Sequence, residues 1–336
     1  MKAVVLNKPG GFDNIAVVDI PAPAPPAAGE LRVRLGASSI NYHDLGIITG
    51  RSAIEESRIL LKDGAGIVES VGPHVEGYAV GDMVIGLSFP TWQKGPPMIC
   101  DFSTSPGDGL DGFACEAVTL PADHFTHAPD GYSLHEAATL PVAAVTAWRA
   151  LIVNGCLQRD ETVLVQGTGG VSIFALQIAK AVGAQVIATS SSDEKLAKLA
   201  EMGADHLINY RTTPDWGQNA FDWTRGKGVD HVVDVGGSTN LANSITAAKI
   251  GGHIAVVGVL AGLSGSLDVI PILSKQVRLQ GCLVGSRCDQ EDLVRFINTT
   301  GIKPVVDRAF PFEQLAEAFR YQQTGKHFGK IVIRVQ

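Results

Sequence analysis

The sequence lacks several features that would assign it to a special class of protein. Its longest apolar runs are short and interrupted, so neither a transmembrane helix nor a membrane partner is expected. The formal net charge is −7, which gives no basic footprint, and a nucleic-acid partner is therefore not expected. The first ten residues, MKAVVLNKPG, contain no long apolar signal region, and we expect a cytoplasmic protein.

Cysteine is also scarce, and its pattern excludes a disulfide framework. The five cysteines are an odd, scattered set: Cys100, Cys115, Cys156, Cys282 and Cys288. Such a set predicts reduced thiols in a reducing compartment.

The length and composition indicate an ordinary globular α/β protein with more than one domain. The chain has 336 residues, of which 45% are hydrophobic and 38 are glycine. A chain of this length exceeds a single hydrophobic core, so two domains are expected. We place a β-rich domain over residues 1–125 and 276–336, and a dinucleotide-binding domain over residues 126–275.

The first part of the chain is rich in short segments of strand character. The predicted strands are Ala3–Leu6, Ile15–Ile20, Leu31–Leu35, Ala65–Val71 and Met83–Ile85. Proline and glycine separate them, which is typical of a compact barrel-like fold. Residues 86–112 are rich in Pro, Gly and Ser and form either a long loop near the functional site or a surface excursion.

Strands and helices alternate in the second part of the chain. The predicted strands are Thr162–Gln166, Gln185–Ser190, His206–Asn209, His231–Val235 and His253–Val257. The predicted helices are Ser172–Val182, Asp193–Met202, Trp216–Trp223 and Leu241–Ile250. This alternation indicates βαβ units and a parallel sheet, so the predicted fold class is α/β with a doubly wound Rossmann sheet. After residue 276 we predict a strand over Val277–Val284, two helices over Gln290–Asn298 and Phe312–Gln323, and a closing strand over Lys330–Val335.

A glycine-rich turn joins the first strand of this alternation to its helix. The sequence there reads Gln166-Gly-Thr-Gly-Gly-Val-Ser. A strand that ends in such a turn and opens into a helix holds a dinucleotide pyrophosphate, because free N–H groups and the positive end of the helix dipole converge there. A plain glycine turn in an α/β sheet is the structural alternative. The predicted phosphate-binding residues are Gly167, Thr168, Gly169, Gly170 and Val171.

The end of the second strand bears on which dinucleotide binds. An NAD site places Asp or Glu about twenty residues after the first glycine, to hold the ribose 2′-hydroxyl. Residues 189–192 are instead Thr-Ser-Ser-Ser, and Lys195 follows one helical turn later. We therefore predict NADPH over NADH, with Ser190, Ser191 and Lys195 near the 2′-phosphate and Tyr210 beside the adenosine. Ser192 also suits a helix cap, with Lys195 merely solvated.

The whole chain resembles the medium-chain dehydrogenase/reductase superfamily. Beside the glycine turn, the resemblance rests on Ile40-Asn-Tyr-His-Asp-Leu, Asp63-Gly-Ala-Gly-Ile-Val-Glu-Ser-Val-Gly, Gly81-Asp-Met-Val, Leu140-Pro-Val-Ala-Ala-Val-Thr-Ala-Trp and Phe328-Gly-Lys-Ile-Val. It implies a GroES-like catalytic domain, a nicotinamide cofactor, a small-molecule substrate and a homodimer formed around Leu267–Ile272.

The chain departs from the zinc alcohol dehydrogenases of that superfamily. Their three catalytic zinc ligands correspond to Asn41, to Leu61-Lys62-Asp63 and to a position near Val142. A catalytic zinc needs three protein ligands with N, S or O donors, so we predict a zinc-free site. The chain therefore resembles the quinone oxidoreductase-like branch. In the sequence, Lys62 and Asp63 are candidates for an ion pair that fills the place of the metal.

The resemblance also implies the roles of individual residues. Asn41 would lie beside the nicotinamide, where an asparagine can equally be a turn residue, and Thr146 would pack on the ring or bond a helix terminus. Tyr42 and His43 are candidate proton donors, with Arg51 and water as others, although a histidine beside Asp44 is often structural. Main-chain groups of Val257, Gly258, Leu283 and Val284 would bind the carboxamide. Lys330 would reach the cofactor phosphates, unless it is a solvated residue at a strand start.

The expected function is NADPH-dependent, zinc-independent hydride transfer to a quinone or an α,β-unsaturated carbonyl. Two other functions remain open. One is an alcohol dehydrogenase or ketone reductase of the same fold. The other is an NADPH-binding sensor or structural protein with little catalysis.

Overall fold

The computed structural model describes residues 1–50, 57–99 and 101–335, which form two compact units. Unit 1 comprises Met1–Val145 and Val284–Gln336, and unit 2 comprises Thr146–Leu283. The unit boundaries differ from the domain boundaries drawn from the sequence. Residues 126–145 belong to unit 1, and residues 276–283 belong to unit 2.

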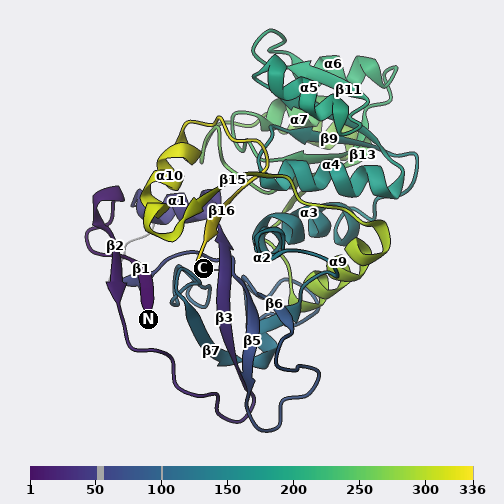
Figure 1. Cartoon of the computed structure of the whole chain (residues 1–336). Helices are drawn as coiled ribbons and strands as arrows, with labels where there is room; N and C mark the ends of the chain where they lie inside the picture. Colours follow the sequence, from purple (N-terminus) through teal and green to yellow (C-terminus); the bar gives the residue numbers. More distant parts are fainter. Residues whose placement is uncertain (51–56, 100, 336) are drawn as a thin grey trace. The chain divides into compact units, whose positions relative to one another are not determined.

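Unit 1 is built on a seven-stranded sheet in the order β15-β16-β3-β5-β6-β8, with β7 also paired to β3 (Figure 1). Its strands are β3 (Glu30–Ser39), β5 (Ala65–Val71), β6 (Met83–Gly86), β7 (Ala117–Pro121), β8 (Phe125–His127), β15 (Val306–Pro311) and β16 (Lys330–Arg334). A smaller sheet has the order β2-β1-β4, with β1 (Lys2–Leu6), β2 (Ile15–Asp19) and β4 (Arg58–Ile59). Because β16 pairs with β3, the last strand of the chain completes the sheet of the first segment.

Four helices and several single turns of the described residues accompany these sheets. They are α1 (Tyr42–Ile48), α2 (Leu134–Ala137), α9 (Arg287–Thr300) and α10 (Leu315–Gln323), with single turns η1 (Phe12–Asn14), η2 (Ala122–His124), η3 (Leu140–Ala144) and η5 (Phe312–Gln314). Alternate residues of β3 point into the core, so Leu31 and Val33 are fully buried with Phe319 from α10 and Ile333 from β16. The same core receives one face of α1.

The segment 86–112 is a long loop that packs into unit 1. After Gly86, its described residues contain no named helix or strand. Phe89, Trp92 and Ser105 are nevertheless buried. These residues therefore pack into unit 1, where the Ser105 hydroxyl accepts from the buried ammonium of Lys62.

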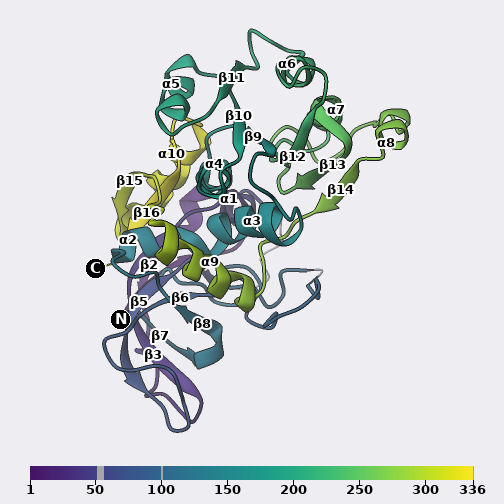
Figure 2. The same ribbon diagram turned by 90° about the vertical axis from the view of Figure 1, so that its right-hand side faces the viewer.

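Unit 2 is a six-stranded parallel sheet in the order β11-β10-β9-β12-β13-β14 (Figure 2). Its strands are β9 (Thr162–Gln166), β10 (Gln185–Ser190), β11 (His206–Asn209), β12 (Val229–Asp234), β13 (Ala248–Val256) and β14 (Arg278–Gly281). Numbered along the unit, this order is 3-2-1-4-5-6, the doubly wound Rossmann arrangement. Its helices and turns are α3 (Val145–Trp148, whose first residue belongs to unit 1), η4 (Arg149–Val153), α4 (Gly170–Val182), α5 (Asp193–Glu201), α6 (Trp216–Trp223), α7 (Leu241–Ala247) and α8 (Ile270–Lys275).

One helix boundary in unit 2 was predicted wrongly. The helix expected over Leu241–Ile250 ends at Ala247, and strand β13 begins at the next residue. Ala248 pairs with Val229 in the parallel ladder, so sheet hydrogen bonding prevails over the local helix preference of the segment. No helix in the described part of the chain is long and apolar enough to cross a membrane.

Candidate functional site

The glycine turn of unit 2 leaves open space above the start of α4. Gly167 has a φ of 72°, a conformation that favours glycine, and Gly169 is the N-cap of α4. A Cβ atom added to either residue would meet no atom within 4 Å. A free helix N-terminus beneath an open glycine turn fits a pyrophosphate.

Buried side chains hold this turn in place from below. The Ser172 hydroxyl donates to the carbonyl oxygen of Gln166 at 2.6 Å, which ties α4 to β9. The Gln166 side-chain amide donates to the Ser244 hydroxyl at 2.8 Å, and that hydroxyl donates to the Asp234 carboxylate at 2.6 Å. The other Asp234 oxygen accepts from the N–H of Gly236 at 2.9 Å. The carboxyl ends of β9 and β12 are thereby fixed to each other.

The predicted adenosine-side residues lie at the same edge of the sheet. The N–H of Gly167 donates to the Thr189 carbonyl at 2.8 Å, and the N–H of Tyr210 donates to the Ser190 carbonyl at 3.1 Å. Ser192 caps α5 by accepting from the N–H of Lys195 at 3.4 Å, so the predicted capping role is confirmed. Tyr210 is exposed, while Ser191 and the Lys195 side chain are half-buried.

The segments predicted to bind the carboxamide follow β13 and β14. The N–H groups of Val257 and Gly258 both donate to the Asp234 carbonyl, so these two donors are already used within unit 2. Leu283 ends unit 2, and Val284 begins the second segment of unit 1 with a φ of 50°. Thr146 is buried in unit 2, where its carbonyl accepts from the Cys282 thiol at 3.8 Å.

Unit 1 contains a buried polar cluster centred on the carboxylate of Asp63. This side chain is fully buried and lies 3.3 Å from the ammonium of Lys330. It also accepts from the Ser39 hydroxyl at 2.6 Å, from Asn41 Nδ2 at 2.9 Å and from the N–H of Val142 at 3.1 Å. Four donors thus satisfy one carboxylate, as a buried charge requires.

Lys330 has different partners from those predicted. Lys330 is only 3% exposed. Its ammonium donates to the carbonyl of Ile40 at 2.9 Å and to Asn41 Oδ1 at 2.6 Å, in addition to Asp63. The side chain therefore points into unit 1, neither solvated nor extended toward a phosphate. Together, Lys330 and Asp63 orient the Asn41 amide and leave one of its N–H bonds without a partner among the described residues.

The predicted ion pair between Lys62 and Asp63 does not form. The ammonium of Lys62 instead donates to the Ser105 hydroxyl at 2.5 Å and to the Pro106 carbonyl at 3.4 Å. Burial lowers the pKa of Lys62 to about 8, against the opposing effect of nearby Asp44, Asp108 and Asp63. Burial also raises the pKa of Asp44, whose Oδ2 accepts from the N–H of Asn41 at 2.7 Å.

The two candidate proton donors lie at the start of α1. His43 Nε2 lies 2.7 Å from Asp108 Oδ2, and its ring packs on Phe102 with centroids 4.0 Å apart. The partner of His43 is therefore Asp108 of the long loop and not the adjacent Asp44. Tyr42 is half-buried against the unit 1 core. Arg51 and Cys100 lie outside the described residues.

The lowered pKa of Lys62 predicts a pH dependence of stability. Between about pH 8 and the ordinary pKa of 10.5, the unfolded chain binds a proton at Lys62 that the folded chain has released. The free energy of unfolding should therefore rise with pH across this window, and this contribution should be lost as the pH falls through 8. We expect Lys62→Met to lack the rise when urea unfolding is measured from neutral to alkaline pH. If the free energy of unfolding depends on pH in the same way in the wild-type protein and in Lys62→Met, the lowered pKa of Lys62 is wrong.

Comparisons with known proteins give the family. Residues 27–130 match the alcohol dehydrogenase GroES-like domain, and residues 170–299 match the zinc-binding dehydrogenase domain. A zinc-type alcohol dehydrogenase-like protein of Schizosaccharomyces pombe is 41% identical over 100% of this chain and 99% of its own. The chain belongs to the medium-chain dehydrogenase/reductase superfamily. The predicted fold class and the prediction of an NAD(P)H-dependent oxidoreductase are confirmed.

Other members of the superfamily cover the same length. A solved structure from Sinorhizobium meliloti 1021 has a TM-score of 0.91 at 36% identity, with 99% of each chain covered. A structure of an NAD-dependent alcohol dehydrogenase has a TM-score of 0.90 at 34% identity and covers all of both chains. A mycobacterial protein complexed with NADPH has a TM-score of 0.83 at 25% identity, over 99% of this chain and 100% of its own. Acryloyl-coenzyme A reductase of Sulfurisphaera tokodaii is 27% identical over 99% of this chain and 100% of its own.

The three positions that the sequence resemblance matched to zinc ligands lie together in unit 1. Asn41, the Leu61–Asp63 segment and Val142 converge on the Asp63 carboxylate through the hydrogen bonds given above. Within the described residues, no group of three or more His, Cys, Asp or Glu side chains is placed to hold a metal ion. The sequence predicted Lys62 as the cationic partner of Asp63, whereas the partner in the structure is Lys330.

Proposed function

We propose that the protein transfers hydride from NADPH to a quinone or an α,β-unsaturated carbonyl without zinc. The observation that carries this proposal is the Asp63–Lys330 ion pair at the point where the three zinc-ligand positions meet. Neither an ammonium nor an apolar Val142 side chain can coordinate a metal ion, so the donor set does not fit a catalytic zinc. The oxygen of the substrate must then be polarised by hydrogen bonds.

The residues of unit 2 fit a dinucleotide. The open turn at Gly167 and Gly169 and the N-terminus of α4 would hold the pyrophosphate. Thr189 and Ser190 end β10 without a carboxylate that would repel a 2′-phosphate. When bound, the nicotinamide supplies the hydride.

In unit 1 the Asn41 amide would donate a hydrogen bond to the substrate oxygen. Lys330 and Asp63 hold it in one orientation, so its remaining N–H is preorganised for a developing oxyanion. Hydride addition to the electrophilic carbon makes that oxyanion, and a proton from water completes the two-electron reduction.

A substrate panel tests this proposal against the two alternatives. We expect the purified protein to oxidise NADPH with simple quinones or enones, to be unaffected by a metal chelator and to contain no stoichiometric zinc. About one zinc per chain, with turnover lost to the chelator, would instead indicate a zinc alcohol dehydrogenase. Tight NADPH binding without turnover of quinones, enones, ketones or alcohols would indicate a sensor or structural protein.

The proposed preference for NADPH predicts a selective effect at Lys195. Lys195→Ala should weaken NADPH binding about tenfold and leave NADH binding unchanged, because only NADPH carries the 2′-phosphate. Lys198→Ala is the matched control, since Lys198 lies in the same helix and pairs with Glu194 on its exposed face. Fluorescence titration with both nucleotides measures the two affinities. If Lys195→Ala weakens the binding of NADPH and of NADH equally, Lys195 does not contact the 2′-phosphate.

We also propose a homodimer formed around α8 in unit 2. Val269, Ile270 and Leu273 are 63–73% exposed there, which is unusual for large apolar side chains. Light scattering coupled to size-exclusion chromatography measures the molecular mass. Leu273→Lys should shift a dimer toward the monomer, because it places a charge on the apolar surface of α8.

A further inference from the structure

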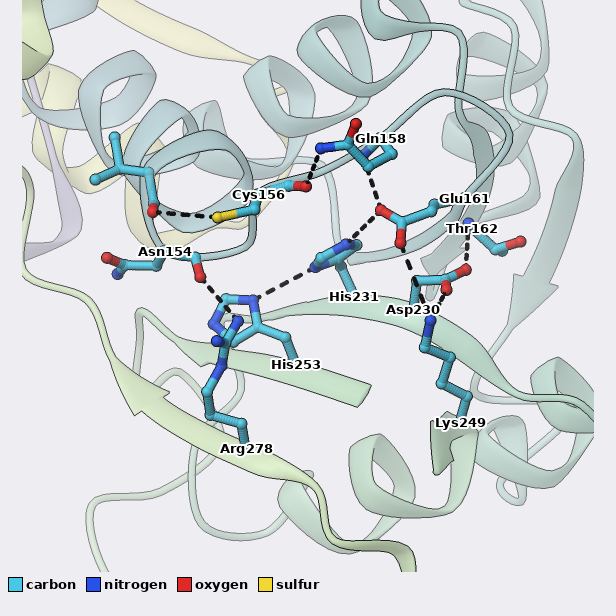
Figure 3. Close-up of polar contacts among 11 residues, drawn as sticks. Asn154, Cys156, Gln158, Glu161, Thr162, Asp230, His231, Lys249, His253 and Arg278 are labelled. Carbon is cyan, nitrogen blue, oxygen red and sulfur yellow. Dashed lines mark hydrogen bonds and ion pairs between the residues drawn. The ribbon is translucent and has the colours of Figure 1, made fainter. Parts of the chain in front are cut away.

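Unit 2 contains a polar cavity at the edge of its sheet opposite the glycine turn. The cavity is about 200 Å³ in volume and lies beside the third residue of β12, the sixth residue of β13 and the first residue of β14. His231, His253 and Arg278 line it and are register neighbours on these three strands. Neighbouring residues of a parallel ladder project from the same face, so the three side chains gather on one side of the sheet (Figure 3).

The two histidines form a hydrogen-bonded chain that begins at a carboxylate. His231 Nε2 lies 3.0 Å from Glu161 Oε2, and because a carboxylate only accepts, the imidazole is the donor. The two Nδ1 atoms lie 3.5 Å apart. If His231 is neutral, its Nδ1 accepts from His253, and His253 Nε2 then carries a bare lone pair. This Nε2 atom is buried and has no hydrogen-bond partner within the described part of the chain, on a residue only 3% exposed.

Of the two positively charged side chains that line the cavity, Lys249 is paired with carboxylates and Arg278 is not. The ammonium of Lys249 pairs with Asp230 and lies 4.0 Å from Glu161. The Arg278 guanidinium donates to the Asn154 carbonyl at 2.8 Å, and the ion pairs of the described residues give it no carboxylate partner. Because the guanidinium has five N–H donors, Arg278 has further donors that could bind an oxyanion.

We propose that this cavity binds a small oxyanion of the size of phosphate, held between His253 Nε2 and the Arg278 guanidinium, and that His253 takes up a proton as the anion binds. The anion would give the buried Nε2 atom the partner that it lacks. Two carboxylates (Glu161 and Asp230) and two fixed cations (Lys249 and Arg278) already balance in formal charge. An added anion therefore needs one compensating proton.

The electrostatics of the empty cavity agree with this coupling. Burial, the positive charge of Arg278 and the neighbouring His231 together lower the pKa of His253 to about 4. His253 is therefore uncharged near neutral pH. A bound anion would offset the positive charge of Arg278 and raise the pKa of His253, so binding should tighten as the pH falls toward the acidic range.

The site would be independent of the nucleotide site. The cavity lies near Thr162, at the start of β9, and the glycine turn follows Gln166 at its other end. Five residues of strand separate the two ends by roughly 16 Å. Anion binding and nucleotide binding can therefore be measured separately, and neither result depends on the proposed catalytic function.

Isothermal titration of the full chain with inorganic phosphate tests the proposal. We expect saturable binding with a Kd on the order of 1 mM and uptake of about one proton, measured from the heats in buffers of different ionisation enthalpy. Glycerol phosphate is a second titrant: binding of both would indicate the phosphate group of a larger ligand, and binding of phosphate alone a free ion.

Two variants with matched controls identify the binding groups. Arg278→Gln should weaken phosphate binding about tenfold or more, and His253→Gln should abolish the proton uptake. Lys198→Gln removes a positive charge and His206→Gln replaces an imidazole elsewhere in unit 2, and neither should alter either quantity. Retained NADPH binding reports that each variant is folded. Absence of saturable binding by the wild-type protein, or unchanged proton uptake in His253→Gln, would overturn the proposal.

Discussion

Replacing Asp63 with asparagine is expected to lower the free energy of unfolding by about 3–5 kcal/mol. The substitution keeps the shape of the side chain but leaves the ammonium of Lys330 buried without a counter-charge. It also faces amide hydrogens toward a site where Ser39, Asn41 and Val142 all donate. Urea unfolding followed by tryptophan fluorescence and circular dichroism measures the loss as a shift of the midpoint.

Two further variants show whether the buried pair itself is responsible. Glu69→Gln removes a carboxylate that pairs with Arg32 and Arg34 at the surface of β5, and should cost less than about 1 kcal/mol. The double variant Asp63→Leu, Lys330→Met should recover part of the loss of Asp63→Asn, because it leaves no buried charge. A loss below about 1 kcal/mol in Asp63→Asn would mean that Lys330 finds water or another partner.

The sequence predicted unit 2 well because its strands are distinct local patterns. Strands β9, β10 and β11 were predicted with the bounds that the structure has, since each is a short apolar run between a helix and a turn. The prediction of a helix over 241–250 failed at its last three residues, which belong to the strand whose first residue pairs with Val229, a contact that no local window contains. The same reason explains why β15, which pairs with β16, was not predicted.

The functional cluster of unit 1 could be predicted only in part. The resemblance located Asn41 and Asp63, but the partner of Asp63 comes from a residue 267 positions later in the chain. A lysine at the first position of a buried strand was the available sign that Lys330 needs an internal counter-charge. The cavity at His231 and His253 was not predicted, although the two strands predicted from the sequence begin with these histidines and the first residues of neighbouring parallel strands lie side by side.

The nucleotide site predicts a large effect from one added methyl group. Gly169 has a φ of −77°, which alanine adopts without strain, and its Cβ atom would meet nothing within 4 Å. Gly169→Ala should therefore change the free energy of unfolding by less than about 1 kcal/mol, the ordinary cost of alanine at an N-cap. The methyl group would nevertheless occupy the space above the turn where a pyrophosphate has to approach the backbone. We expect NADPH binding to weaken by at least about tenfold, measured by fluorescence titration.

The separation of these two effects is what identifies the turn as a binding surface. Gly167→Ala provides the contrast, since its φ of 72° adds backbone strain to the same steric obstruction. That variant should lose both stability and affinity, whereas Gly169→Ala should lose affinity alone. If Gly169→Ala binds NADPH as tightly as the wild-type protein, the open space above the turn does not hold the cofactor phosphates. The proposed hydride donor would then have no place in unit 2, because the start of α4 is the feature on which its binding there depends.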